Sequence, residues 1–428
     1  MAGERVAALS RHGKVRMSDF DIIVIGAGAA GLAAARRLSA AALSVRVLES
    51  RNRLGGRAWT WRDPSGLPID LGCGWLHSAD ENEWCAIAEE RGYALDRAAP
   101  TWRRQLDNIG FPPADQQEWR AAMGRFYTRL EEAGDTTPDQ SADRLLEPGC
   151  RWNALMNATS SYINGVELDR LSVHDYWRYR DTEVNWRVIE GYGTLIAASG
   201  AGLDVTLDCP AEVIEHAGKT VRVETPRGDL RCRAVIVTVP TNVLATGLPR
   251  FRPELADKRA AAAVLPLGVA DKLFLRLDGA EEFPVDSHLT GAFDRVATGS
   301  YYLRPMGRPL IEGYFGGRFA AELEAEGEGA FANFAIDQLA GLLGGAIRKR
   351  LHPVAASAWA SDPHARGSYS HAMPGHADAR RILAAPVDDR LFFGGEACSV
   401  HDFSTAHGAY RTGVAAADAA IAALVRRR

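Results

Sequence analysis

A buried strand, a glycine-rich turn and a helix follow one another near the N-terminus, and they constrain the fold more than any other feature. DIIVIG (21–26) is apolar enough for a buried strand, and AAGLAAARRLSAA (29–41) has a helical composition. Between them, Gly26, Gly28 and Gly31 permit a tight turn, a close approach to a pyrophosphate and close helix packing. A second strand, SVRVLE (44–49), completes a βαβ unit. The sequence therefore predicts an α/β fold with a Rossmann-like dinucleotide-binding domain.

The residues after this unit distinguish between dinucleotides. Glu49 ends the second strand, at about the 20-residue distance where a carboxylate accepts a hydrogen bond from a ribose hydroxyl. The run ESRNRLGGRAWT (49–60) then supplies a second glycine turn and Arg57, a guanidinium suited to a diphosphate. A nicotinamide dehydrogenase has no use for this second turn, so the pattern favours FAD. DLGCGWLH (70–77) adds a further glycine turn, from which Trp75 and His77 project.

Strand and helix signals alternate at both ends of the chain and not in its middle. We therefore expect an FAD-binding domain assembled from residues 17–80, 187–266 and 371–428, with short strands between 202 and 240. An inserted α+β substrate-binding domain is expected from residues 81–186, which are mainly helical, and 267–370. Residues 1–16 carry charges throughout and are expected to be disordered.

Composition excludes several classes of function. The formal net charge is −4, and acidic and basic residues are interleaved, which argues against nucleic acid as a partner. No stretch approaches the roughly 20 apolar residues of a membrane span. The six cysteines lack paired spacing, so we expect neither a metal site nor disulfides, and a reducing, cytoplasmic location. The oligomeric state is left open, with a homodimer as one possibility.

Three further motifs, together with the N-terminal one, carry a resemblance to a known family. They are GVADKLFLRL (268–277), AWASDPHARGSYS (358–370) and FFGGEACSVHDFSTAHGAYRTG (392–413). From about residue 20 to its end the chain resembles the flavin-containing amine oxidases, which include monoamine oxidases, polyamine oxidases and flavin histone demethylases. Its motifs are most similar to those of the polyamine oxidase group.

The resemblance implies an FAD site and a substrate pocket. Lys272 stands where the family has its flavin-facing lysine, which holds a water near flavin N5, and burial beside cationic groups is expected to lower its pKa. His77, Tyr369 and Thr405 are expected in the substrate pocket. The residues expected to bind FAD are Gly26, Gly28, Ala30, Gly31, Glu49, Arg51, Gly55, Gly56, Arg57, Gly74, Trp75, Val213, Glu396, Thr405 and Ala406.

The closing motif is expected to direct a helix N-terminus at the flavin. Ser404 or Thr405 can cap a helix that begins near Thr405, and its free N–H groups would face the negative edge of the reduced ring. Gly408 and Ala409 are expected to keep the backbone close to the ring. Glu396, by resemblance, would accept a hydrogen bond from the ribityl chain.

The implied reaction is oxidation of a C–N bond. Hydride passes from the α-carbon of an amine to flavin N5, the imine is hydrolysed, and O2 reoxidises the flavin with release of H2O2. Two readings from other classes remain open, an FAD-dependent desaturase or dehydrogenase acting on C–C bonds and a non-catalytic flavoprotein scaffold.

The chain departs from the monoamine oxidases at two positions. Ser368 replaces the cysteine that binds their flavin covalently, so FAD is expected to be non-covalent. Thr405 replaces the second tyrosine of their aromatic sandwich, which favours aliphatic secondary amines or polyamines over arylalkylamines. The candidate partners for a second substrate ammonium are Asp175, Asp181, Glu183 and Glu190.

Overall fold

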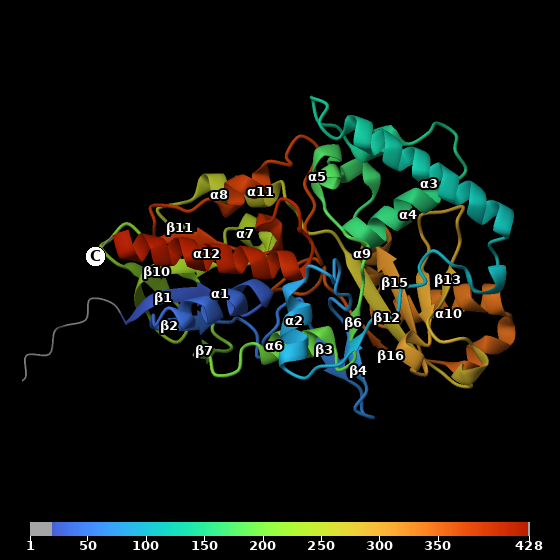
Figure 1. The fold of residues 1–428 in the computed structure, drawn as a ribbon, viewed down its shortest axis with the longest axis horizontal. Coiled ribbons are helices and arrows are strands. Elements are labelled where there is room, and N and C mark those ends of the chain that lie inside the picture. Colours follow the sequence, from blue (N-terminus) through green and yellow to red (C-terminus); the bar gives the residue numbers. More distant parts are fainter. Residues whose placement is uncertain (1–18, 427–428) are drawn as a thin grey trace, which may run out of the picture.

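The computed structural model describes residues 19–426, so the predicted disorder of residues 1–16 lies outside the described residues. Figure 1 shows one sheet with its helices at the left of the molecule and a second sheet with its helices at the right. Segments from the beginning, middle and end of the chain lie side by side in the left-hand part.

The left-hand sheet has eight strands and mixed direction. In hydrogen-bonded order its path runs β11, β8, β9, β10, β1, β2, β7, and β17 pairs with β10 outside this path. Strand β1 is parallel to β2 and β10, and β10 is parallel to β17, whereas β9 is antiparallel to β10. This arrangement confirms the predicted α/β, Rossmann-like class. The strands are β1 (Phe20–Ile25), β2 (Val45–Leu48), β7 (Val205–Thr206), β8 (Val213–Glu215), β9 (Val221–Glu224), β10 (Leu230–Val237), β11 (Arg250–Arg252) and β17 (Leu391–Phe393).

Two hydrophobic clusters hold helices against this sheet. One contains side chains of α1 (Ala29–Ala40), α2 (Glu83–Glu90), α6 (Tyr192–Ala198) and α12 (Ala406–Arg426). The other includes α7 (Thr241–Ala245), α8 (Ala256–Ala263) and α11 (Ala379–Ala384). Helices α1 and α12 touch closely, because a Cβ on Gly413 would lie 2.1 Å from the Ala30 carbonyl oxygen. The last helix of the chain therefore packs directly on the first (Figure 1).

The right-hand sheet has five antiparallel strands in the order β13, β14, β15, β12, β16. They are β12 (Ala270–Leu277), β13 (Ser287–Thr290), β14 (Ser300–Leu303), β15 (Leu310–Gly316) and β16 (Leu351–Ala356). Helices α9 (Gly317–Glu326) and α10 (Ala330–Leu343) cover one face. On the other face, Phe274 and Leu310 pack against the hairpin of β3 (Thr60–Arg62) and β4 (Pro68–Asp70).

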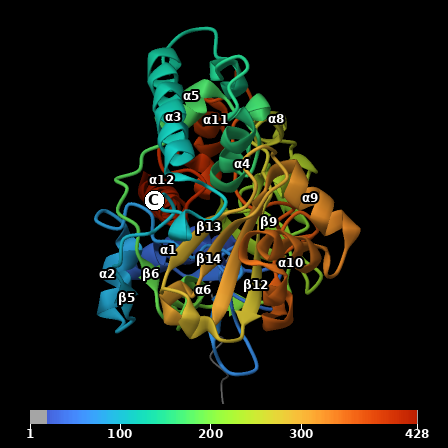
Figure 2. The same cartoon turned by 90° about the vertical axis from the view of Figure 1, so that its right-hand side faces the viewer.

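A helical block with its own core lies next to this sheet (Figure 2). It contains α3 (Pro113–Ala133), α4 (Asn153–Asn164) and α5 (Val173–Arg178). Strands β5 (Leu95–Asp96) and β6 (Arg187–Val188) form a separate pair. Short 3-10 helices cover Leu106–Asn108, Ala142–Leu145, Leu168–Arg170, Ala280–Glu282, Pro305–Gly307, Gly345–Arg350 and Glu396–Cys398. Helix α2, although expected in the second domain, packs into the first cluster through Trp84, so the exact domain boundaries stay a prediction.

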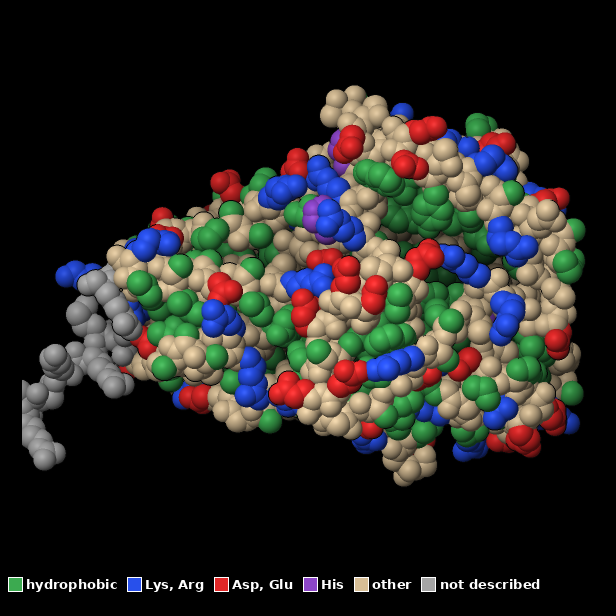
Figure 3. Space-filling model, in the orientation of Figure 1, with side chains coloured by type: hydrophobic (Ala, Val, Ile, Leu, Met, Phe, Trp, Pro, Cys, Tyr) green, Lys and Arg blue, Asp and Glu red, His purple; other side chains and the backbone are tan. Residues whose placement is uncertain are grey.

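Three surface and composition findings bear on function. No helix within residues 19–426 is long and apolar enough to cross a membrane. All six cysteines are free. Acidic and basic side chains are interspersed over the face shown in Figure 3, without a continuous field of one sign.

Candidate active site

The first glycine turn has the geometry of an anion site. Gly26 has φ of +100°, and a Cβ on Gly31 would lie 1.9 Å from the Gly26 carbonyl oxygen, so neither position tolerates a side chain. Helix α1 begins at Ala29, after Gly28, with no side-chain cap and no acidic residue in its first turn. Its first N–H groups and the positive end of its dipole are therefore available to a phosphate.

Glu49 ties this turn to the second one. Glu49 is 4% exposed, and its carboxylate accepts hydrogen bonds from the backbone N–H of Ala27 (2.7 Å) and of Arg51 (2.9 Å). The N–H of Gly55 donates to the Ala27 carbonyl at 2.9 Å. The predicted residues of both turns are therefore brought together, and Glu49 has a structural role in addition to its predicted contact with ribose.

Arg51 lies at the edge of this region and is already paired. Its guanidinium donates to both carboxylate oxygens of Asp362, at 2.6 and 2.7 Å. The ion pair joins the second glycine turn to the segment that leads into GSYS, and the expected contact of Arg51 with FAD stays a prediction.

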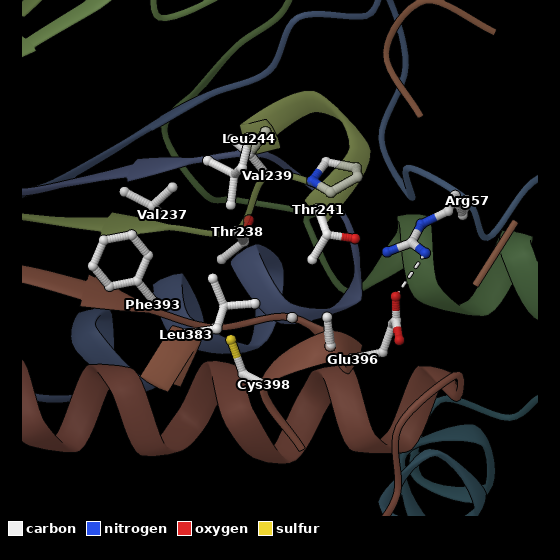
Figure 4. Close-up of a pocket in the computed structure, with 14 residues that line it drawn as sticks. Arg57, Val237, Thr238, Val239, Thr241, Leu244, Leu383, Phe393, Glu396 and Cys398 are labelled. Carbon is white, nitrogen blue, oxygen red and sulfur yellow. Dashed lines mark hydrogen bonds and ion pairs between the residues drawn. The ribbon is translucent and has the colours of Figure 1, made fainter. Parts of the chain in front are cut away.

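Arg57 and Glu396 form an ion pair (Figure 4) at the centre of a largely buried polar cluster. Arg57 Nη1 donates to Glu396 Oε1 at 2.8 Å and to the Ser368 carbonyl at 2.7 Å. Glu396 Oε2 accepts from Ser370 Oγ at 2.6 Å and from the N–H of Ser404 at 2.9 Å. Burial alone raises the pKa of Glu396, but Arg57, the Ser370 hydroxyl and Arg380 outweigh burial and hold the pKa below its ordinary value. Glu396 is therefore a carboxylate at neutral pH.

A pocket opens beside this ion pair, and sequence reasoning missed one of its walls. Residues 237–241 and Leu244 form that wall, and Leu383, Phe393–Cys398 and Arg57 line the remainder (Figure 4). The Thr241 hydroxyl is buried and has no hydrogen-bond partner among the described residues. The signal was available, because VIVTVP ends a strand parallel to β1 and the carboxyl ends of parallel strands meet at one sheet edge.

These features fit the cofactor that the sequence implies. The uncapped N-terminus of α1 suits a diphosphate, Glu49 suits a ribose hydroxyl, and the unpartnered Thr241 hydroxyl is a free hydrogen-bonding group in the pocket beside Arg57. Together these hydrogen-bonding groups are those expected of a dinucleotide site.

The N-terminus of α12 is capped as expected, and the structure gives a further reason for the glycine at 408. Thr405 caps it, because Thr405 Oγ1 accepts from the N–H of Gly408 at 2.9 Å and donates to the Asp402 carbonyl at 2.6 Å. A Cβ on Gly408 would lie 1.9 Å from the Asp402 carbonyl oxygen. Gly408 is therefore required by the turn before the helix, which by itself accounts for the glycine. The Ala406 carbonyl accepts from Trp84 Nε1 at 3.2 Å.

Lys272 is buried and paired with an acid. Its side chain is 4% exposed, and Nζ lies 2.9 Å from Glu312 Oε1. A Cβ on Gly74 would lie 2.8 Å from Nζ, so this glycine makes room for the ammonium. Burial alone lowers the pKa of Lys272, but Glu312, Tyr314 and Asp70 outweigh it and raise the pKa above its ordinary value. The expected lowering of this pKa is wrong, because the neighbours are acids rather than cations.

An aromatic cluster surrounds the predicted Trp75 and His77. The Trp75 ring lies 4.8 Å from that of Trp102 and 6.0 Å from that of Tyr302, between ring centroids. His77 Nδ1 lies 2.6 Å from Asn185 Oδ1, and its ring centroid lies 6.3 Å from that of Trp102. Burial lowers the pKa of His77, and Asp181 offsets burial only in part. His77 is therefore neutral at pH 7.

The remaining predicted residues lie in different places. Tyr369 donates its hydroxyl hydrogen bond to the Tyr162 carbonyl, and burial raises its pKa. Val213 is fully buried in β8, and β9 and β10 separate that strand from β1. Asp175 is fully buried and bound to Arg380 at 2.6 Å. A role for Asp175 as partner of a substrate ammonium is therefore wrong, because Arg380 already neutralises it inside the core.

Comparison with known proteins gives a family and close relatives. The model of the family described as flavin containing amine oxidoreductase matches residues 29–126 and 95–421. Polyamine oxidase 4 of Oryza sativa subsp. japonica is 31% identical over 93% of this chain and 88% of the relative. Polyamine oxidase 2 of Arabidopsis thaliana is 30% identical over 97% of this chain and 90% of the relative.

A solved structure shares the fold. The structure of a putrescine oxidase bound to putrescine superposes with a TM-score of 0.75, covering 94% of this chain and 99% of that one at 18% identity. At this identity the likeness establishes the fold alone.

Proposed function

This chain belongs to the flavin-containing amine oxidoreductase family, and we propose that it oxidises aliphatic secondary amines or polyamines, with FAD held without a covalent bond and O2 reduced to H2O2. It is an FAD-dependent amine oxidoreductase. The observation that carries the proposal on the site is the buried ammonium of Lys272. It is paired with Glu312 and lies against Gly74, on the segment that also carries Trp75 and His77.

When bound, FAD would supply a two-electron acceptor that takes a hydride from the amine α-carbon and passes the two electrons on to O2. The protein's own residues supply the surroundings. The α1 N-terminus and the two glycine turns would hold the diphosphate, and Glu396 with Arg57 would hold a polar group of the cofactor beside the pocket. Lys272 presents an ammonium that can orient water by donating a hydrogen bond.

An amine substrate must lose a proton before its α-carbon can lose hydride, which costs about 4 kcal/mol at pH 7 for an alkylamine of pKa about 10. Trp75, Trp102 and Tyr302 form an aromatic cluster, and the Arg187 guanidinium lies 4.9 Å from the centre of the Trp75 ring, so a nearby positive charge would disfavour the ammonium form of an amine bound there. His77 Nδ1–H donates to Asn185, which leaves Nε2 as an acceptor for a substrate N–H.

A second ammonium would meet the segment 181–185. Asp181 lies close enough to His77 to affect its pKa, and Glu183 is exposed and paired with Arg103 at 2.9 Å. Both carboxylates are accessible, whereas Asp175 is not. The two accessible carboxylates support a multiply charged aliphatic substrate over an arylalkylamine.

A peroxide-coupled screen of amines tests the proposal. We expect spermine, spermidine or N-alkylated diamines to give a higher kcat/KM than benzylamine or phenylethylamine, and a preference for the aromatic amines would contradict it. Acid precipitation should release the yellow colour into the supernatant as FAD, because Ser368 offers no sulfur for a covalent link. Colour that stays in the pellet would contradict the non-covalent assignment. A cytoplasmic location and a homodimer stay predictions.

A further inference from the structure

Lys272 and Glu312 meet because of the register of two antiparallel strands. Lys272 on β12 stands directly opposite Tyr314 on β15, and Phe274 stands opposite Glu312. Residues two apart on a strand share a face, so Glu312 and Tyr314 both face the lysine, one diagonally and one directly. The Lys272 Nζ lies 2.9 Å from Glu312 Oε1 and 5.2 Å from the centre of the Tyr314 ring.

The pair is buried on the face that meets the β3–β4 hairpin. The side chains of Lys272 and Glu312 are only 4% and 14% exposed. Asp70, at the end of β4, is a second acid near the ammonium, but Thr60 Oγ1 and the N–H groups of Tyr192 (3.0 Å) and Gly193 (3.3 Å) already bind its carboxylate. Glu312 is therefore the acid placed to hold the ammonium itself.

We propose that Glu312 is a positioning residue that fixes Lys272 Nζ as a charged hydrogen-bond donor at the reaction site. The proposal rests on the proposed function in assigning Lys272 to the reaction. A buried ammonium needs a carboxylate at contact distance, and a flexible four-carbon side chain needs a partner that fixes its end. Without Glu312, Nζ should lose its proton more readily and should no longer be held in one position.

The other charged and titratable groups around the pair are Asp70, Cys73, His77, Tyr314 and Arg308. Arg308 donates to the carbonyls of Pro68 (3.0 Å) and Ile189 (2.6 Å), so it is engaged elsewhere. None of these five groups forms an ion pair with Nζ, whereas Glu312 does, at 2.9 Å.

The scarcity of lysine allows a direct test. The chain has five lysines, at 14, 219, 258, 272 and 349, so [ε-13C]lysine labelling gives five resolvable signals whose shifts report ionisation. In the wild-type protein the Lys272 signal should titrate at a pH no lower than the signals of the exposed lysines. In Glu312→Gln it should titrate roughly 1–3 pH units earlier, the size expected for loss of an opposite charge at contact distance. Lys258, whose pKa burial lowers to about 8, is the internal reference and should not move.

Two further variants identify the responsible carboxylate. Glu312→Asp keeps the charge and should restore most of the wild-type titration, while Asp70→Asn should shift it less than Glu312→Gln. A Lys272 signal that is unchanged in Glu312→Gln, or that moves more in Asp70→Asn, would overturn the proposal.

A kinetic readout completes the test. Flavin reduction by a saturating amine should slow at least ~10-fold in Glu312→Gln and gain a new dependence on pH, with partial recovery in Glu312→Asp. If no amine reduces wild-type flavin while the NMR result holds, the proposed function fails and the positioning role stands. If amines reduce all variants at the wild-type rate, the positioning role is overturned although the proposed function stands.

Discussion

Arg57 Nη1 lies 2.8 Å from Glu396 Oε1, so a guanidinium from the second glycine turn and a carboxylate 339 residues later form an ion pair beside the pocket. The Glu396 side chain is 6% exposed, and its remaining oxygen accepts from Ser370 and Ser404. The pair links the second glycine turn, near the N-terminus, to the segment that follows β17.

We expect this link to stabilise the fold except in acid. Because the folded pKa of Glu396 lies below its ordinary value of 4.5, its stabilisation is complete above that pH and is lost as pH falls through the folded pKa. Glu396→Gln should lower the free energy of unfolding by about 3 kcal/mol at pH 7, with a smaller difference below pH about 4. Urea unfolding of both proteins from pH 3 to 7 measures this. Glu282→Gln, which breaks an exposed pair with Arg350, is the control and should cost under about 1 kcal/mol. An equal cost for the two variants would contradict the prediction.

The first glycine turn should not tolerate one methyl group. In Gly31→Ala the added Cβ would meet the Gly26 carbonyl oxygen, which is backbone and cannot move aside, so we expect loss of bound FAD. Gly124→Ala is the matched control, because Gly124 lies on an exposed helix face with no atom within 4 Å of the added Cβ. The control variant should retain FAD, and its free energy of unfolding should rise by about 1 kcal/mol. Flavin absorbance per protein after desalting decides between them, and normal FAD content in Gly31→Ala would contradict the account.

The sequence was sufficient for the parts of the site that are local. The glycine spacing, the strand end at Glu49 and the cap at Thr405 each depend on residues close together in the chain or on one βαβ unit, and the structure places them as expected. The charge state of Lys272 could not be predicted in this way. Its partner Glu312 is set by the register between β12 and β15, which no local pattern determines.

Two other differences have the same origin. Asp175 lies in a charged, helical stretch, which suggests a surface position. It is instead fully buried and paired with Arg380, which is 205 residues away in the chain. Gly408 was expected to keep the backbone close to the flavin, which stays a prediction, and the turn at Asp402 is a further reason for a glycine there. Long-range pairings and local backbone clashes look alike in a sequence, since both leave only a charge or a glycine.

A buried histidine should make the protein sensitive to mild acid. His371 is 2% exposed, neither ring nitrogen has a partner within residues 19–426, and burial together with Arg170 and Arg380 lowers its pKa to about 3. Because the folded pKa lies below the ordinary 6.5, stability is lost as pH falls from 6.5 toward 3, by up to about 1.4 kcal/mol per pH unit. His371→Leu should remove that part of the slope in urea unfolding, whereas a change at the exposed His364 should not. An unchanged slope in His371→Leu would rule out this contribution.

Lys272→Met should separate binding from turnover. We expect FAD to remain bound and turnover to fall by ~10²-fold or more, since a positioned charged donor is lost. The variant also leaves Glu312 buried without its partner, so the protein should be less stable, and Lys272→Met/Glu312→Leu should recover stability but not activity. Thermal unfolding and steady-state kinetics of the three proteins check both parts. Recovery of activity in the double variant would show that Lys272 has only a structural role.

The most direct test of the account is anaerobic mixing of the yellow wild-type protein with a single amine in a stopped-flow instrument. We predict that spermine or spermidine bleaches the oxidised flavin rapidly, that benzylamine does so more slowly, and that admitting O2 restores the colour with one H2O2 per flavin. A flavin that no amine bleaches, while a C–C substrate does, would contradict the assignment of amine oxidation to this site.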